Sequence, residues 1–193
     1  MEETLHASDL AGHCNELTAW RILRDVSGTL LTDTSLPVSP YLIEINDDGS
    51  FSLAQASEPA DIGGFAAPEQ AKGTASEASA VWSLAASLFY VVMGCQVMNG
   101  KGGGAQHENS KLPYMRSALP LLSETVQQCL QYHPELRPSL REINALAARQ
   151  YDQCNEIIKK GPKIQEKKHQ QGASEATSGM DLVFWPEVMQ AEK

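Results

Sequence analysis

The chain has 193 residues, of which 42% are hydrophobic and 20% charged, as expected for a globular domain followed by a tail. Its 24 Asp and Glu exceed its 15 Lys and Arg, and the formal net charge of −9 argues against a nucleic-acid backbone as partner and favours a basic protein segment. No apolar run reaches the roughly 18 residues of a membrane-spanning helix, and the acidic start shows no signal-peptide pattern.

The charge is unevenly distributed along the chain. Residues 1–154 contain 18 Asp and Glu against 9 Lys and Arg, whereas residues 155–193 contain 6 of each kind. The four cysteines are far apart and form no CxxC pair, which predicts free thiols in a reducing cytoplasm. Cys129 and His133 are four residues apart, but no second ligand pair accompanies them, so we expect neither a zinc site nor a cofactor.

The first part of the chain predicts a helix after a short N-terminal turn. Residues 5–14 have the character of a short helix or turn, and a clearer helix is expected over residues 16–31, with Asn15 as its N-cap. Two prolines in residues 32–40 should end it. The buried stripe of this helix is expected to consist of Trp20, Leu23, Val26 and Leu30.

A β-hairpin is predicted next. The runs 41–46 and 51–54 are rich in β-forming residues, and they flank an Asp-Gly turn in which Gly49 supplies the positive φ that such turns need. Residues 55–64 are polar and predict a loop, and a short helical stretch is expected from the Ala67-Pro68-Glu69 segment to Ala71.

Three further helices are predicted in the second half. Residues 79–93 have almost no polar face and predict a central buried helix that ends at Gly94. Residues 99–109, rich in glycine, predict a flexible loop; a phosphate-binding loop is disfavoured, because this stretch follows a helix rather than a strand. Residues 119–132 predict an amphipathic helix, and Ser139 should cap a last helix that runs to about Ile157.

The composition changes after this last helix. Residues 159–179 are dominated by Lys, Gln, Gly, Ser and Glu, which predicts a disordered linker. Residues 180–193 restore a short apolar segment, in which Phe184 and Trp185 are candidate anchors for docking into a groove or for folding back on the domain. The expected organisation is therefore a domain over residues 1–158, the linker and the apolar segment.

Three segments, in this order, resemble the C-terminal lobe of protein kinases. Ala67-Pro68-Glu69 resembles the motif that closes the activation segment, and residues 79–94 resemble the signature of the central kinase helix. Residues 129–139, with Pro134, Arg137 and Pro138, resemble the segment between the last two helices of that lobe. The resemblance implies a mainly α, kinase C-lobe-like domain with a small β-hairpin and no N-terminal lobe. It also implies a structural ion pair between Glu69 and Arg137, because an arginine can hold a carboxylate through two hydrogen bonds.

The residues that kinases need for phosphoryl transfer are missing at the matching positions. The catalytic loop reads Ser35-Leu36-Pro37 in place of its His-Arg-Asp motif, Leu42 stands where a metal-binding asparagine is expected, and Gln55 begins the stretch in place of the Asp-Phe-Gly motif. Ala80 replaces the aspartate of the central helix that braces the catalytic loop. We therefore expect no kinase activity, and no sequence signature of another enzyme class is present.

A kinase C-lobe without an N-lobe or catalytic groups resembles the KIND domain, the kinase non-catalytic C-lobe domain of Spire actin nucleators and very-KIND Ras exchange factors. Residues 5–10 and 16–20 are similar to the start of that family, although its usual Gly-Arg-Pro-Leu is replaced by Gly12-His13-Cys14-Asn15. The resemblance implies a cytoplasmic, cytoskeleton-associated docking module for a formin-like or microtubule-associated protein with a basic segment. A candidate acidic patch for that segment consists of Glu44, Asp47, Asp48, Glu58 and Asp61.

Two alternatives stay open from the sequence. The domain can act as a pseudokinase-like regulator or scaffold of an active kinase, or the charges of the candidate patch can be ordinary solvated turn residues.

Overall fold

The structure is a computed structural model that describes residues 4–54, 62–115 and 119–160. All the described residues belong to one compact unit, Met1–Gly161. The described residues form four α-helices, six short 3-10 helices and one two-stranded antiparallel sheet, which confirms the mainly α prediction with a small hairpin. Within these residues no helix combines the length and apolar character needed to cross a membrane.

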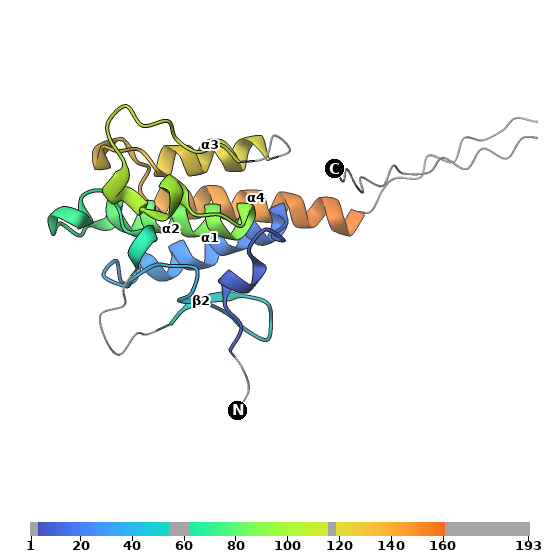
Figure 1. The fold of residues 1–193 in the computed structure, drawn as a ribbon. Coiled ribbons are helices and arrows are strands. Elements are labelled where there is room, and N and C mark those ends of the chain that lie inside the picture. The colour runs from blue at the N-terminus through green and yellow to red at the C-terminus, as the bar shows by residue number, and fades with distance from the viewer. Residues whose placement is uncertain (1–3, 55–61, 116–118, 161–193) are drawn as a thin grey trace, which may run out of the picture. The chain divides into compact units, whose positions relative to one another are not determined.

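Helix α2 (Glu77–Met93) forms the centre of the described unit, between α1 and α3 (Figure 1). Thirteen of its 17 residues are buried, as expected for a helix that is apolar all round. It begins two residues earlier than the sequence pattern predicted, because Ser76 is its N-cap and accepts a hydrogen bond from the Ser79 amide. Its C-terminus is closed by Gly94, whose φ of 71° lies in the left-handed region.

Helices α1 (Glu16–Leu30) and α4 (Leu140–Lys160) pack against each other in antiparallel orientation. The Asn144 side-chain amide donates to the Arg24 carbonyl at 2.7 Å and to the Ser27 hydroxyl at 3.0 Å, and further along α4 the Tyr151 ring lies 4.2 Å from the Arg24 guanidinium. The predicted N-cap is confirmed, since the Asn15 side chain accepts from the Thr18 amide. The predicted stripe of α1 is buried at all four positions: Trp20, Leu23, Val26 and Leu30.

The predicted hairpin is confirmed, with β1 (Ile43–Ile45) paired to β2 (Phe51–Leu53) in the register Ile43 to Leu53. At its turn the Gly49 amide donates to the Asn46 carbonyl at 2.8 Å, and the φ of Gly49 is 74°. The Asp25 carboxylate accepts from the Phe51 amide at 3.1 Å and thereby ties β2 to α1. The N-terminal residues before the short helix η1 (Ala7–Leu10) run beside β1, where the Ile45 amide donates to the Leu5 carbonyl.

Helix α3 (Pro120–Cys129) ends three residues before the predicted boundary. Its sequence pattern continues to Tyr132, but the backbone leaves the helix because the carbonyls of Gln131 and Tyr132 accept hydrogen bonds from Arg137 instead. The short helix η6 (Pro134–Leu136) then leads into α4, where Ser139 accepts from the Glu142 amide, as predicted for its cap. At its other end α4 extends to Lys160, three residues beyond the predicted end.

The prediction of a flexible glycine loop after α2 is wrong. This stretch forms two 3-10 turns, η4 (Val97–Gly100) and η5 (Gly102–Ala105), which pack on η2 (Gly63–Phe65). The Gly103 amide donates to the Ala66 carbonyl at 2.8 Å. A Cβ atom at Gly103 would collide with the backbone nitrogen of Pro68. Gly103 is therefore needed for the close packing of two backbone segments.

Candidate functional site

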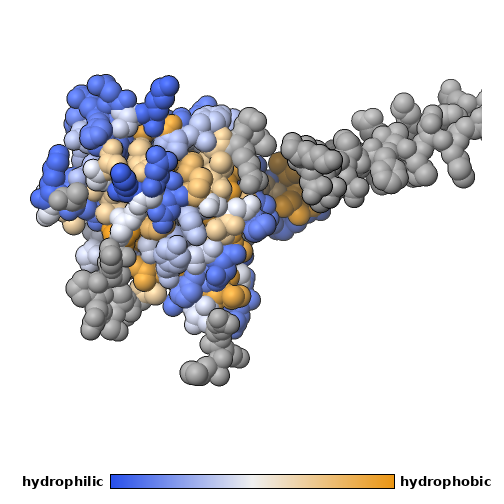
Figure 2. Space-filling model, viewed as in Figure 1, coloured by the Kyte–Doolittle hydropathy of each residue, from blue (hydrophilic) through white to orange (hydrophobic). Residues whose placement is uncertain are grey.

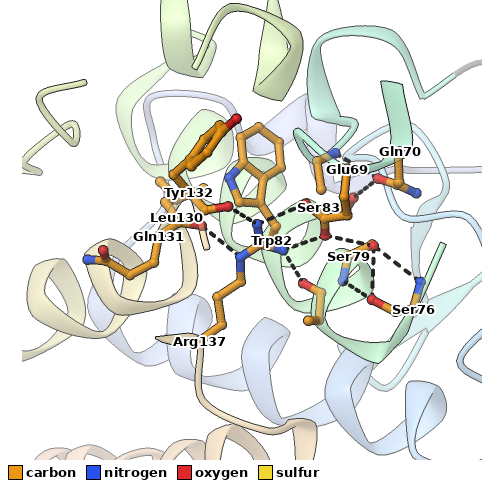
Figure 3. Close-up of polar contacts among 12 residues, drawn as sticks. Glu69, Gln70, Ser76, Ser79, Trp82, Ser83, Leu130, Gln131, Tyr132 and Arg137 are labelled. Carbon is orange, nitrogen blue, oxygen red and sulfur yellow. Dashed lines mark hydrogen bonds and ion pairs between the residues drawn. The ribbon is translucent and has the colours of Figure 1, made fainter. Parts of the chain in front are cut away.

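The predicted contact between Glu69 and Arg137 is present near the N-terminus of α2 (Figure 3). The two guanidinium NH groups of Arg137 donate to the two carboxylate oxygens of Glu69 at 2.6 Å and 2.9 Å. The Arg137 side chain is fully buried, whereas 14% of the Glu69 side-chain surface stays exposed. This two-point geometry is that of a strong, charge-assisted pair.

All five N–H donors of Arg137 have acceptors, which makes this residue the hub of the region. Besides the two bonds to Glu69, Nε donates to the Gln131 carbonyl at 2.7 Å, NH1 to the Ala78 carbonyl at 2.8 Å, and NH2 to the Tyr132 carbonyl at 3.1 Å. These acceptors belong to the first turn of α2 and to the chain after α3. Arg137 thus joins the chain after α3 to Glu69 and to the first turn of α2.

Glu69 remains ionised in this environment. Burial on its own would raise the pKa of the Glu69 carboxyl, but the hydrogen bonds from Arg137 and from the Ser79 hydroxyl (2.8 Å) leave that pKa below its usual value. Ser79 also belongs to the capping interaction with Ser76 at the start of α2. The ion pair and the helix cap therefore share one network, which sequence reasoning predicted only in its central pair.

Glutamines supply two further links that no sequence pattern indicates. Gln106 accepts from the Trp82 indole N–H at 3.0 Å and donates to the Leu130 carbonyl at 2.7 Å, so it bridges α2 to the end of α3. Gln70, at the start of η3 (Gln70–Lys72), accepts from the Ala67 amide at 2.7 Å and from the Ser83 hydroxyl at 3.3 Å. Both side chains accept hydrogen bonds from α2, and Gln106 does so in the buried interior, which is a structural role.

At the positions that would carry kinase chemistry, the described side chains are apolar. Leu42 is half-buried beside the hairpin, and its carbonyl accepts from the Ala54 amide at 2.8 Å. Ala80 is buried within α2, and Pro37 lies in the irregular segment after α1. None of these groups can bind a metal ion or transfer a proton. The fourth position, Gln55, lies outside the described residues.

An aromatic cluster that the sequence did not reveal includes Tyr41, the residue before Leu42. The ring centroids of Tyr41 and Phe65 are 6.1 Å apart, and those of Phe65 and Tyr90 are 5.8 Å apart, both in edge-to-face arrangement. A hydrogen bond with Tyr90 raises the pKa of the Tyr41 hydroxyl, and partial burial adds to that shift. Tyr41 is half-exposed, at 51% of its surface, so this cluster reaches solvent beside the hairpin.

Three residues of the candidate acidic patch lie on the hairpin. Asp47 and Asp48 are exposed in its turn, and Glu44 is partly exposed on β1. Hydrogen bonds from the Ser50 side chain and amide lower the pKa of Asp48, which keeps this carboxylate charged. Arg21 lies at the same turn and donates to the Asp48 carbonyl at 3.2 Å, so one positive charge borders the patch. Glu58 and Asp61 lie outside the described residues.

Cys129 and His133 lie in different environments, one buried and the other at the surface. Cys129 is buried, and its burial raises the pKa of the thiol to about 12. The His133 ring nitrogens lie 3.4 Å and 3.5 Å from the carboxylates of Glu108 and Glu135 at the surface. Phe184 and Trp185, the candidate anchors of the C-terminal segment, lie outside the described residues.

No protein-family model matches this chain, and no curated protein matches its sequence.

Proposed function

We propose that this chain is a non-catalytic, cytoplasmic docking module of the KIND type, which binds a basic segment of a cytoskeletal or signalling protein. The observation that carries the proposal is that the residues that would brace a kinase-like lobe are present, whereas the catalytic positions hold apolar residues. The Glu69–Arg137 pair and the buried helix α2, which would brace a kinase-like C-lobe, are present. The positions that would hold catalytic and metal-binding groups are occupied by Pro37, Leu42 and Ala80.

The charge of the domain supports a basic partner. Residues 1–154 carry twice as many acidic as basic residues, and the hairpin presents Asp47 and Asp48 to solvent. Complementary charge of this kind accelerates encounter and fixes the register of a bound segment. The Arg21 guanidinium, which donates to the Asp48 carbonyl, reduces the negative potential at the turn. We therefore expect a bound segment to place its basic groups at Asp47 and Asp48 and away from Arg21.

The proposal is tested by the binding of fluorescent peptides to the purified full chain. We expect a basic peptide from a formin tail, or a basic fragment of a microtubule-associated protein, to bind with an affinity that falls as salt is raised. Replacing both turn carboxylates (Asp47→Lys, Asp48→Lys) should reduce that affinity by about tenfold or more, because two attractive charges become repulsive.

The matched control is the double variant Asp152→Lys, Glu156→Lys, which makes the same charge change on the exposed side of α4. If both double variants weaken binding equally, net charge alone explains the effect and the hairpin is not the docking surface. Magnesium-dependent ATP hydrolysis by the purified chain would contradict the non-catalytic assignment. Specific binding to an active kinase through this domain would support the pseudokinase-like alternative instead.

A further inference from the structure

A cluster of aromatic rings lies at the end of the hairpin opposite its turn. Tyr41 precedes β1 by two residues, and its ring centroid lies 6.1 Å from that of Phe65 in η2 and 6.1 Å from that of Tyr90 in α2. These three residues, here called the Tyr41 cluster, are buried at Phe65 and exposed at Tyr41. Figure 2 shows apolar side chains among hydrophilic ones over the lower part of the domain, where Figure 1 places the hairpin.

The packing restrains Tyr41 and still leaves much of its ring accessible. The ring contacts two other rings, and the Tyr41 hydroxyl forms a hydrogen bond with Tyr90. About half of the side chain nevertheless remains exposed. A restrained tyrosine loses little conformational entropy when a ligand binds, and tyrosines are common anchors of protein interfaces. Tyr41 therefore has the properties of a contact residue.

The stretch of chain that surrounds this cluster has no positive charge. Residues 25–71 contain eight Asp and Glu but no Lys, Arg or His, so they account for nearly all of the net charge of −9. Of these eight residues, Asp25 and Glu69 are paired with arginines within the fold. Among the described residues, no ion pair involves a carboxylate of the hairpin. The uncompensated negative charge of this stretch favours a cation from another molecule.

Other tyrosine rings in the domain already have a cation beside them. The Arg24 guanidinium lies 4.2 Å from the centroid of the Tyr151 ring, and the Lys72 ammonium lies 5.7 Å from that of Tyr132. At such distances the negative face of an aromatic ring attracts a positive charge. In the part of the chain that the structure describes, no Lys or Arg lies over Tyr41. Its ring is thus open to a cation that the domain itself does not supply.

The surroundings of the cluster select among ligand classes. A strand cannot be added at the outer edge of β1, because the Ile45 amide donates to the Leu5 carbonyl there and His6 pairs with Glu44. A nucleic acid would be repelled by the acidic stretch. An arginine or lysine side chain matches both features, since its apolar stem packs on a ring and its charge is attracted to the ring and to nearby carboxylates.

We propose that the Tyr41 cluster binds an arginine or lysine side chain of the partner's basic segment, with the cation over the ring of Tyr41. The inference rests on the proposed docking function and assigns a second contact to the same segment. Tyr41 and Asp47 are six positions apart along an extended strand, which corresponds to about 20 Å. An extended basic segment of about seven residues can therefore place one cation at Tyr41 and another at the turn.

The test measures the binding of a fluorescein-labelled peptide of six Gly-Arg repeats to the purified full chain by fluorescence anisotropy. Tyr41→Leu preserves the net charge and an apolar side chain, and we expect it to weaken binding about fivefold, because the aromatic ring is lost. Tyr41→Phe keeps the ring and should bind within about twofold of the unchanged chain. Phenylalanines with one, two and three ring fluorines at position 41 should weaken binding stepwise, because each fluorine reduces the negative potential of the ring face.

The matched control is Tyr114→Leu. Tyr114 is as exposed as Tyr41, at 52% against 51%, but it contacts no other ring among the described residues. This control should leave the Kd within about twofold. Equal losses in Tyr41→Leu and Tyr114→Leu, a loss in Tyr41→Phe as large as that in Tyr41→Leu, or no binding of the peptide to the unchanged chain would each overturn the inference.

The same peptide separates this inference from the proposed function. If the hairpin variant Asp47→Lys, Asp48→Lys loses binding while Tyr41→Leu keeps it, the docking function stands and the contact at Tyr41 is refuted. If Tyr41→Leu loses binding while the hairpin variant keeps it, the aromatic contact stands and the acidic patch at the turn is refuted. Thermal unfolding of each variant, followed by circular dichroism, verifies that the domain is folded in these comparisons.

Discussion

At the scale of single residues, Arg137 is the side chain that holds the region around the start of α2 together, through five hydrogen bonds. It is fully buried, and its guanidinium is shared among one carboxylate and three carbonyls. A buried ion pair is weak evidence of net stabilisation, because desolvation of both charges offsets their attraction. Removing one partner is costly all the same, because the remaining groups stay buried without a hydrogen bond.

We therefore predict that Arg137→Leu lowers the free energy of unfolding by about 3–5 kcal/mol, since Glu69 and three carbonyls lose their donor. Arg137→Lys should recover only part of this loss, because an ammonium group cannot form the two parallel bonds to Glu69. Urea unfolding followed by circular dichroism measures both values. Arg141→Leu, at an exposed position of α4, is the control and should change stability by less than about 0.5 kcal/mol. A comparable loss in that control would show that the network is not responsible.

The ionisation of Glu69 gives a prediction about pH. Its pKa is lowered in the folded state, so its contribution to stability is fully present above the unfolded-state pKa of about 4.3 and is lost as pH falls through the folded value. Other carboxylates titrate in the same range, so the relevant quantity is the stability difference between the unchanged chain and Glu69→Gln. We expect this difference to be constant between about pH 7 and pH 5 and to shrink below about pH 4. A difference that stays constant down to about pH 3 would mean that folding does not lower the pKa of Glu69.

At the scale of elements, the two neighbouring glycines of η5 allow a sharp comparison. A Cβ at Gly103 would collide with the Pro68 nitrogen and lie 2.5 Å from the Ala67 carbonyl carbon, whereas a Cβ at Gly104 would meet nothing within 4 Å. We predict that Gly103→Ala destabilises the protein by about 3 kcal/mol or more, because backbone atoms cannot move aside. Gly104→Ala should be neutral or slightly stabilising. Thermal unfolding of both variants tests this, and equal melting temperatures would show that the two segments are not in close contact.

The elements also show which features were predictable from sequence. The hairpin and α2 were predicted because their signals are local: Gly49 at a turn between two β-rich runs, and a run of apolar residues closed by Gly94. Gly103 of η5 was misinterpreted, because the residues that it contacts, Ala67 and Pro68, lie more than 30 positions away in the sequence. Gln106 was missed for the same reason, since a single glutamine has no pattern that reports its bonds to Trp82 and Leu130. The Glu69–Arg137 pair is a long-range contact too, and it was predicted only through resemblance to kinases.

At the scale of the whole molecule, α4 completes the core that α1 and α2 begin. Leu140, Ile143 and Ala147 of α4 are buried, and the α1–α4 contact is the most extensive between helices of the described unit. Since burying a Leu or Ile side chain contributes roughly 1.5–3 kcal/mol, removing α4 would cost most of the typical 5–15 kcal/mol stability of a domain. The described residues therefore act as one cooperative unit that ends with α4 and not before it.

Two truncations test this at the level of the chain. A fragment of residues 1–161 should unfold cooperatively, with a urea midpoint within about 0.3 M of the full chain, because all the buried residues described lie inside it. A fragment that ends at Ser139 should lack cooperative unfolding, because the apolar stripe of α1 loses the helix that covers it. Circular dichroism and urea titration of the two fragments distinguish the outcomes. If the longer fragment were substantially less stable than the full chain, the domain boundary after α4 would be wrong, and residues 162–193 would belong to the folding unit.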